Sequence, residues 1–265
     1  MGVNMDLHLR GRSALITGAS AGIGLASARV LAGEGCNLVL VARTERTLQE
    51  AAASVRQEHK VDVKVVAADL SRDGSAESLA AQHGDVDILV NNAGAIPGGS
   101  IAEVDQARWR AGWELKVFGF IAMTRAFYAR MQARRRGVII NVIGASGTGV
   151  DARYIAGSTG NAALEALSKA LGVASTEHGV RVVGLSPGVV LTERSKGMLQ
   201  GRAKAKFGDP EKWPDLLGHL PFGRTATTEE IASAVAFLAS DRSGYTSGTV
   251  VTIDGGQSQR TNWWG

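Results

Sequence analysis

Short apolar runs alternate along the chain with longer segments whose apolar residues recur at helical spacing. The short runs predict strands near residues 13–17, 37–42, 63–67, 86–90, 138–143, 180–186 and 249–253. Such apolar strands are typical of a parallel sheet buried on both faces, with helices in the right-handed crossovers between strands. The pattern therefore predicts an α/β fold with a doubly wound parallel sheet of seven strands and helices on both faces.

The turn after the first strand carries three glycines in the order Gly-x3-Gly-x-Gly, at Gly18, Gly22 and Gly24. Gly18 permits a sharp turn, Gly22 leaves room for a pyrophosphate, and Gly24 lets the next helix pack closely on the strand. That helix, expected over residues 25–33, offers unpaired N–H groups and partial positive charge to phosphates at its N-terminus. The turn thus indicates a phosphate cradle, although similar turns also serve as plain connections.

The composition fits one domain spanning residues 1–265. Of the 265 residues, 45% are apolar and 20% are charged, and one α/β domain of this length buries most of its apolar surface. No apolar run approaches the ~18 residues of a membrane helix, and the chain begins without the basic-then-apolar order of a signal peptide. We therefore expect a cytoplasmic protein that does not associate with a membrane.

The charges argue against a nucleic-acid-binding protein, and the single cysteine argues against a disulfide-bonded one. The net charge is +4, and the lysines and arginines are spread out without interleaved aromatic residues, which argues against a nucleic-acid partner. Cys36 lies at the start of an apolar run, where a free cysteine usually acts as a small buried hydrophobe, and it cannot form an internal disulfide. We also expect no bound metal.

Further motifs follow the predicted strands in order. Asp69-Leu70 follows the third, Asn91 to Gly94 the fourth, Ser186-Pro187-Gly188 the sixth, and Asp254-Gly255-Gly256 the last. With the glycine turn, these motifs resemble those of the short-chain dehydrogenase/reductase family over nearly the whole chain. The resemblance implies a single-domain Rossmann-type fold, a nicotinamide dinucleotide cofactor, and oxidation of an alcohol or reduction of a carbonyl.

The resemblance also implies which residues touch the cofactor. They are Gly18, Ser20, Ala21, Gly22, Ile23, Gly24, Arg43, Asp69, Leu70, Asn91, Ala93, Gly94, Asn161, Pro187, Gly188, Val190 and Thr192. An acid at the end of the second strand would bond the 2′-hydroxyl of NAD, whereas here Ala42 is neutral and Arg43 is a cation. We therefore expect NADP as the cofactor, with NAD still possible. The alternative for Arg43 is that it is only a solvated charge at the end of a strand.

The family's usual catalytic residues are substituted. It places a Tyr and a Lys four residues apart on one helix, a Ser after the fifth strand and an Asn on the preceding long helix. The segment Ala162 to Leu167 matches the family sequence that follows the Lys, so Asn161 stands at the Lys position and Gly157 at the Tyr position. The Ser position falls on Gly144 and the Asn position on Lys116. We therefore expect a non-standard proton relay.

Three other residues are candidates for that relay. Tyr154 lies one helical turn before Gly157, Lys116 provides a cation, and Ser146 provides a hydroxyl two residues after Gly144. Tyr supplies a proton in this family, and a nearby ammonium lowers a phenol pKa. The alternatives are that Tyr154 is a wall residue and that Lys116 belongs to a structural ion pair.

The segment 189–224 is long, rich in Lys and Arg, and expected to be irregular; in the family it is the substrate lid. Apolar residues alternate with its charges, so it suits a small molecule with a carboxylate or an acyl thioester, unless the charges merely face water. The long helices expected near 103–134 and 152–176 carry apolar faces that relatives pair into homodimers or homotetramers.

The leading hypothesis is an NAD(P)(H)-dependent short-chain oxidoreductase that acts on a carbonyl or alcohol through a non-standard proton relay. Because the nucleotide pocket remains while the usual relay does not, two alternatives stay open. One is a nucleotide-binding protein without redox chemistry, a sensor or an oligomer partner. The other is a lyase or isomerase on the same fold.

Overall fold

The fold is built around one parallel sheet, seen in a computed structural model that describes residues 5–260. Its seven strands are β1 (Ser13–Thr17), β2 (Asn37–Ala42), β3 (Val63–Ala67), β4 (Ile88–Asn91), β5 (Gly137–Val142), β6 (Val180–Pro187) and β7 (Thr249–Ile253). They pair in the order β3-β2-β1-β4-β5-β6-β7, and every neighbouring pair is parallel. The predicted single-domain Rossmann-type sheet is therefore confirmed.

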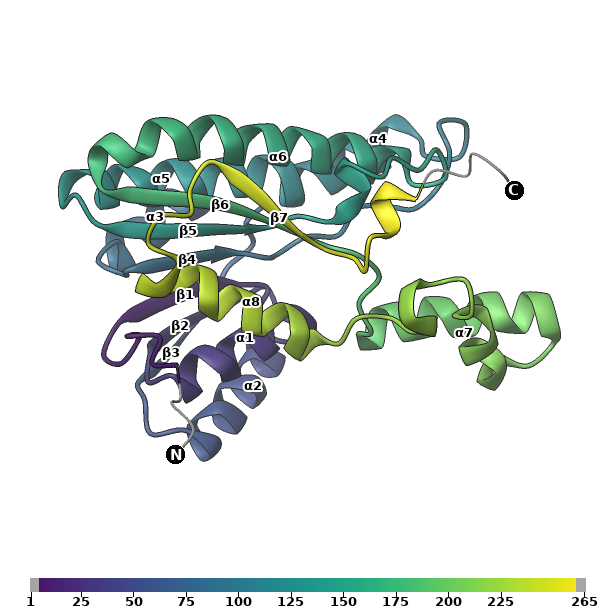
Figure 1. The fold of residues 1–265 in the computed structure, drawn as a ribbon, viewed down its shortest axis with the longest axis horizontal. Helices are drawn as coiled ribbons and strands as arrows, with labels where there is room; N and C mark the ends of the chain where they lie inside the picture. The colour runs from purple at the N-terminus through teal and green to yellow at the C-terminus, as the bar shows by residue number, and fades with distance from the viewer. Residues whose placement is uncertain (1–4, 261–265) are drawn as a thin grey trace.

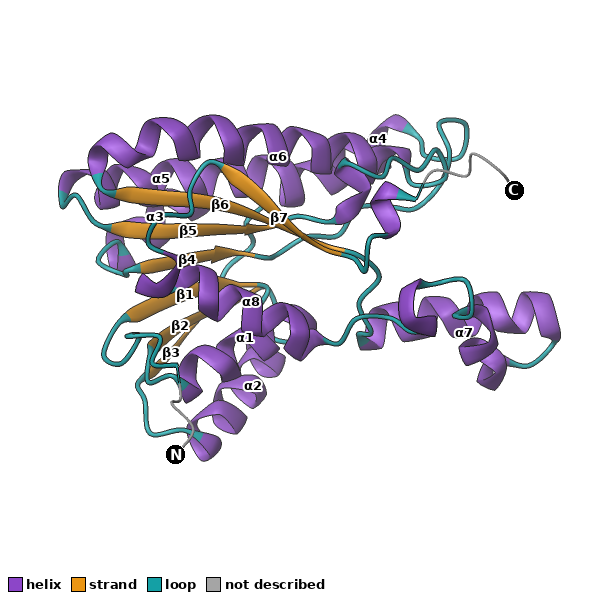
Figure 2. Ribbon diagram, in the orientation of Figure 1, coloured by secondary structure: helices purple, strands orange, loops and turns teal. Residues whose placement is uncertain are grey.

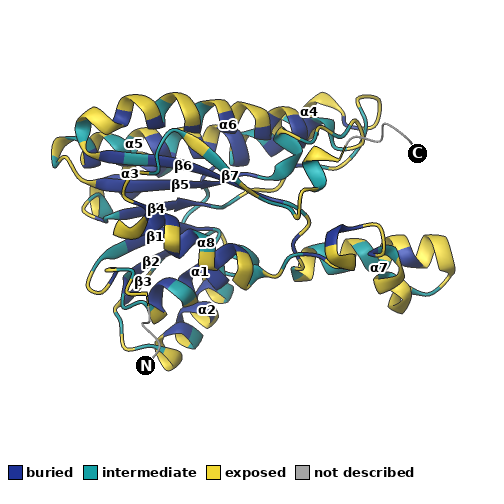
Figure 3. Ribbon diagram, viewed as in Figure 1, coloured by how far each residue is buried: buried dark blue, intermediate teal, exposed yellow. Residues whose placement is uncertain are grey.

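Helices cover both faces of the sheet (Figures 1 and 2). One face carries α1 (Gly22–Gly33), α2 (Glu45–Glu58) and α8 (Thr228–Ala239), and the other carries α3 (Ser75–His83), α5 (Gly119–Ala133) and α6 (Ile155–Ala174). Each face has its own apolar core against the buried strands, as the dark blue central strands of Figure 3 show. In the described residues, no helix is both long and apolar enough to cross a bilayer.

Helix α8 begins with a capping box. Thr227 is the N-cap: its hydroxyl accepts a hydrogen bond from the N–H of Glu230, whose carboxylate accepts one from the N–H of Thr227. This reciprocal pair satisfies two N–H groups that would otherwise lack partners at the helix start.

The long helix expected near 103–134 is interrupted. It consists of α4 (Gln106–Trp113), a wide π-helical turn over Glu114–Phe118, and then α5. Such π turns often occur at functional sites, because the extra residue in the turn reorients the side chains that it carries. Lys116 lies in the middle of this turn.

The lid is more regular than the sequence suggested. The segment expected to be irregular contains α7 (Glu193–Phe207), which packs against the helical turns over Pro210–Leu216. In Figure 1 these two elements project from the main body beside the carboxyl ends of the strands. Only Ala203 of α7 is buried, and a helix that is polar on nearly all sides lacks the apolar stripe from which a helix is recognised in sequence.

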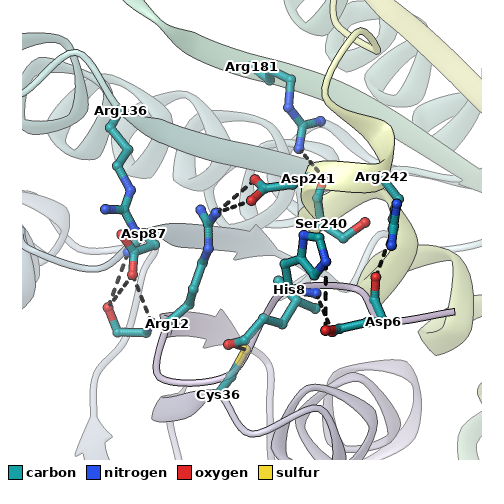
Figure 4. Close-up of polar contacts among 12 residues, drawn as sticks. Asp6, His8, Arg12, Cys36, Asp87, Arg136, Arg181, Ser240, Asp241 and Arg242 are labelled. Atoms are coloured by element: carbon teal, nitrogen blue, oxygen red, sulfur yellow. Dashed lines mark hydrogen bonds and ion pairs between the residues drawn. The ribbon is translucent and has the colours of Figure 1, made fainter. Parts of the chain in front are cut away.

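A polar network closes the amino-end edge of the sheet (Figure 4). Arg12 donates two hydrogen bonds of 2.7 Å to the carboxylate of Asp241, and Arg136 pairs with Asp87 at 2.9 Å. Arg181 donates to the carbonyl of Ser240 at 3.0 Å. These contacts tie the segment before β1 to the strands β5 and β6 and to the turn that precedes β7.

Residues 1–4, part of the start that showed no signal-peptide pattern, lie outside the described range.

Candidate active site

A cleft opens at the carboxyl ends of β1, β2 and β4, and we call it the glycine cleft. Its lining includes six residues that the sequence assigned to the cofactor: Gly18, Ser20, Arg43, Leu70, Ala93 and Gly94. Ala42, the neighbour of Arg43, also lines it. Strands that share one sheet edge bring these distant segments together, as expected where ligands bind in open parallel sheets.

The glycine turn has the close backbone approaches that its sequence predicts. Gly18 and Gly22 have positive φ of 66° and 56°, and a Cβ at Gly24 would overlap the carbonyl oxygen of Gly18. The side-chain amide of Asn92 donates to the carbonyl of Thr17 at 3.0 Å and holds the end of β1.

The N-terminus of α1 has no side-chain cap. Its N-cap is Ala21, which offers no acceptor, whereas α4, α7 and α8 are capped by Asp105, Thr192 and Thr227. The first N–H groups of α1, from Gly22 and Ile23 onward, thus remain available to an anion. This open helix end beside a tight glycine turn fits the phosphates of a dinucleotide.

Asn91 and Asp69, both assigned to the cofactor, are not part of the lining of the cleft. Asn91 is 1% exposed, and its amide donates to Asn141 Oδ1 at 2.9 Å and Thr124 Oγ1 at 3.0 Å, so it braces the sheet beneath the cleft. Asp69 accepts hydrogen bonds from Ser71, which lower the pKa of Asp69, and the positive charge of Arg43 acts in the same direction.

The residues after β6 connect the lid to the glycine turn. Pro187 ends β6, and the N–H of Gly188 donates to the carbonyl of Ile253 at 2.9 Å. Val190 pairs with Ala226 across the base of the lid. Thr192 caps α7 and brings its methyl against the turn, since a Cβ at Gly22 would lie 3.3 Å from that methyl.

Tyr154 takes the space next to Gly157. A Cβ at position 157 would overlap both Cε1 and Cζ of the Tyr154 ring. Tyr154 also packs against the buried apolar cluster of Ile96, Val104 and Ala156. Burial raises the pKa of Tyr154, and the charge of Arg194 partly offsets this effect, so the phenol stays protonated at neutral pH.

Ser146 and Asn161 lie together, as candidates for one site should. The amide nitrogen of Asn161 donates to Ser146 Oγ at 2.8 Å. A Cβ at Gly144 would lie 2.8 Å from the same nitrogen, so the amide fills the space that a side chain at position 144 would need. The hydroxyl hydrogen of Ser146 remains free to donate elsewhere.

Lys116 is buried, with 8% of its surface exposed. Its Nζ donates to the carbonyl of Val142 at 2.6 Å and lies 4.2 Å from the ring centre of Phe120. Burial lowers the pKa of Lys116 to about 7. Its stem runs against Gly94, where a Cβ would overlap Cδ.

The expected partnership of Lys116 with Tyr154 is not seen. Within residues 5–260 no hydrogen bond joins the two side chains, and Lys116 is not among the charges that shift the pKa of Tyr154. The ion pairs of these residues do not include Lys116 either, so the structural alternative of an ion pair is also absent there.

Two residues of this region escaped the sequence analysis. Glu165, one turn after Asn161 on α6, is buried and accepts hydrogen bonds of 3.1 Å from Thr148 and Ser186. Arg194, in the first turn of α7, lines the glycine cleft from the lid side. In the sequence, Arg194 is one of many charged residues of the lid. It lies far along the chain from the motifs that form the cleft, so its place in the cleft could not be inferred from the sequence.

A second, mostly apolar pocket lies at the base of the lid. Its walls include Val189, Leu220, Pro221 and Phe222. Arg224 on its rim is bound through both guanidinium nitrogens to Glu230, at 2.7 and 2.9 Å. This cation is therefore already neutralised by a carboxylate.

Known proteins resemble the chain over nearly its whole length. A family model described as enoyl-(acyl carrier protein) reductase matches residues 18–258. Galactitol 2-dehydrogenase (L-tagatose-forming) of Cereibacter sphaeroides is 35% identical over 94% of this chain and 96% of its own length. L-xylulose reductase of Bos taurus is 34% identical over 95% of this chain and 98% of its own.

A solved structure agrees with the chain in fold as well. L-sorbose reductase from Gluconobacter frateurii, complexed with NADPH and L-sorbose, superimposes with a TM-score of 0.88 at 34% identity, over 97% of this chain and all of that one. The predicted oxidoreductase class and nicotinamide cofactor class are thereby confirmed at the level of the family. From the glycine cleft to the last strand, the chain belongs to the short-chain dehydrogenase/reductase family.

Proposed function

We propose that this protein is an NADP-dependent reductase of a small carbonyl compound, and that it uses Tyr154 as its proton donor. The observation that carries the proposal is that Gly157 has no side chain and that the phenol ring of Tyr154, the N-cap residue of α6, occupies the space beside it. We infer that the phenol has moved by one helical turn from the position at which the family has its Tyr.

The cofactor would be held by the residues that the sequence assigned to it. The open N-terminus of α1 suits the pyrophosphate, and Arg43 suits a 2′-phosphate because it is the cation at the end of β2. The segments around Ala93 and Pro187 would form the walls of the nicotinamide site, with Asn161 beyond them. The reduced nicotinamide, when bound, supplies a hydride.

Tyr154 is suited to donate a proton. Because burial raises its pKa, the phenol keeps its proton at neutral pH, which favours the direction of carbonyl reduction. Its ring lies against the backbone of position 157, because a Cβ there would overlap Cε1 and Cζ. The proton would pass to the carbonyl oxygen directly or through one water molecule.

Ser146 and Lys116 complete the proposed relay. Ser146, held by Asn161, would orient the carbonyl oxygen through its free hydroxyl hydrogen. Lys116 exchanges its proton near neutral pH, because its pKa is lowered to about 7, and so could return protons to the buried region behind Gly94.

The substrate and assembly are proposed more broadly. The basic lid supports a small molecule with a carboxylate or an acyl thioester, and the relatives named for galactitol and L-xylulose support small polyols and sugars as further test compounds. Exposed Phe118 and Ile121 near the start of α5 support a homodimer or homotetramer. We keep the cytoplasm as the proposed location.

The test is a turnover assay with NADPH. Ketoses, oxo acids and 3-oxoacyl thioesters are offered, and the loss of nicotinamide absorbance is followed in the wild type and in Tyr154→Phe. Reduction of any class that falls sharply in the variant supports the proposal. Tight NADPH binding without turnover of any class would favour a nucleotide-binding protein without redox chemistry. Conversion of a substrate without net nicotinamide change would favour a lyase or isomerase.

A further inference from the structure

We propose that Arg194 binds the carboxylate of an oxo-acid substrate and holds its carbonyl group beside Tyr154. This inference rests on the proposed function and narrows it to one substrate class. In the step itself, the carbonyl carbon takes a hydride from the reduced nicotinamide and the carbonyl oxygen takes a proton from Tyr154. The product is a hydroxy acid, and its carboxylate is unchanged.

Arg194 has a free guanidinium at the site. It lines the glycine cleft together with Gly94 and Leu115, and it is exposed. Across residues 5–260, the ion pairs and side-chain hydrogen bonds with a carboxylate do not involve it. An arginine with five donors in a planar fork is the side chain best matched to a carboxylate.

The other cations of the site are already committed. Lys116 donates to the carbonyl of Val142 and lies against Phe120. Arg224 is bound on two sides by Glu230. Arg43, at the end of β2, acts on Asp69 through its charge and is the cation proposed for the 2′-phosphate. Arg194 is left for another anion in the cleft.

The position of Arg194 is fixed by the glycine turn. It is the second residue of α7, two residues after Thr192, whose methyl packs on Gly22. Helix α7 itself gains nothing from an arginine there, because the N-terminal end of a helix carries partial positive charge.

Arg194 also lies close enough to act on Tyr154. Its positive charge is the one that opposes the effect of burial on the Tyr154 phenol. A carboxylate bound to Arg194 would thus lie near the proton donor, with the carbonyl group of the same molecule between the phenol and the nicotinamide side of the cleft. In small 2-oxo and 3-oxo acids the carbonyl group is only one or two bonds away from the carboxylate carbon, so both groups of one molecule could reach Arg194 and Tyr154.

The test compares each oxo acid with its own methyl ester, which has the same carbonyl but no charge. We expect the wild type to prefer the acids by roughly 100-fold in kcat/KM, and Arg194→Gln to lose this preference mainly through a higher KM. Arg194→Lys should keep part of the preference, since it retains the charge but not the fork. Arg202→Gln, on the same helix and outside the cleft lining, should keep all of it.

The outcomes separate this inference from the proposed function. A wild type that reduces acids and esters equally would overturn the carboxylate assignment and leave the reductase in place, whereas no reduction of any compound would overturn the reductase. If Arg194→Gln weakens NADPH binding in a fluorescence titration, Arg194 binds a cofactor phosphate instead and the inference fails.

A measurement without substrate tests the geometry directly. Spectrophotometric titration of the three tyrosines, with Tyr154→Phe to assign the signal, reports the phenol pKa. We expect Arg194→Gln to raise the pKa of Tyr154 and Arg202→Gln to leave it unchanged. An unchanged pKa in Arg194→Gln would place the guanidinium too far from the phenol for the proposed arrangement.

Discussion

The ring of Tyr154 and the backbone of Gly157 share one space: no side chain at position 157 can coexist with the ring where it lies. A tyrosine at position 157, where the resemblance to the family places the proton donor, could therefore not coexist with Tyr154 in its present position. The two positions are neighbours in space because Tyr154 is the N-cap residue of α6 and Gly157 lies in the first turn of that helix.

The first prediction concerns the phenol itself. Tyr154→Phe should lower kcat by roughly 100-fold, the usual scale for loss of a general acid, because the ring stays in place and only its hydroxyl is removed. NADPH affinity should not change. Tyr128→Phe, on α5, serves as the control and should keep full turnover. Normal turnover in Tyr154→Phe would mean that the proton comes from another group.

The second prediction concerns the space beside the ring. Gly157→Ala should displace the ring, since the added methyl would overlap two of its atoms, and it should lower turnover at least tenfold with a loss of stability of about 1–3 kcal/mol. Gly197→Ala is the matched control, because it is also a helical glycine but has open space around it. That change should be neutral or slightly stabilising in urea unfolding. Equal behaviour of the two variants would refute the steric argument.

The third prediction concerns cofactor choice. Arg43 is the cation at the end of β2, so NADPH should bind at least tenfold more tightly than NADH, and Arg43→Asp should reverse the order. Arg46→Asp, three residues further on and paired with Glu50 on the surface, should keep the wild-type order. Fluorescence titration with both cofactors measures the ratio. Equal affinities in the wild type would assign Arg43 to the solvated surface.

The sheet could be predicted closely from the sequence because its strands are continuous apolar runs. Six of them lie within one residue of their expected bounds at both ends, among them β1 and β7. The fourth begins at Ile88 rather than 86, since Asp87 turns its carboxylate to the N–H of Ser13 and to Arg136 before the pairing with β1 starts. Local polar contacts of this kind leave no periodic signal.

The parts of the site that are formed by the backbone could be predicted from the sequence. The parts that depend on the positions of buried side chains could be predicted less well. The glycine turn follows from residue types with special φ values, so its shape could be inferred. The expected pairing of Lys116 with Tyr154 could not be judged, because the wide turn over Glu114–Phe118 directs the amine to the carbonyl of Val142. Arg194 enters the cleft through the capped start of α7, a helix without an apolar stripe.

The fourth prediction concerns the cost of burying Lys116. Its pKa falls from 10.5 in an exposed state to about 7 in the folded protein, so between these values the unfolded chain binds a proton that the folded chain does not. The free energy of unfolding should therefore rise with pH across this interval, by at most about 1.4 kcal/mol per pH unit. Below pH 7 both states carry the proton, and the full desolvation penalty destabilises the fold.

Lys116→Met should remove this rise, because it retains the apolar stem without the amine. Urea unfolding at several pH values between 7 and 10.5 measures the slope, and the variant should gain most over the wild type at the acidic end of the interval. Lys169→Met, which alters an exposed lysine on α6, should keep the wild-type slope. If wild type and Lys116→Met showed the same pH dependence, the amine would reach solvent in the folded protein, and its proposed part in proton return would lose its physical basis.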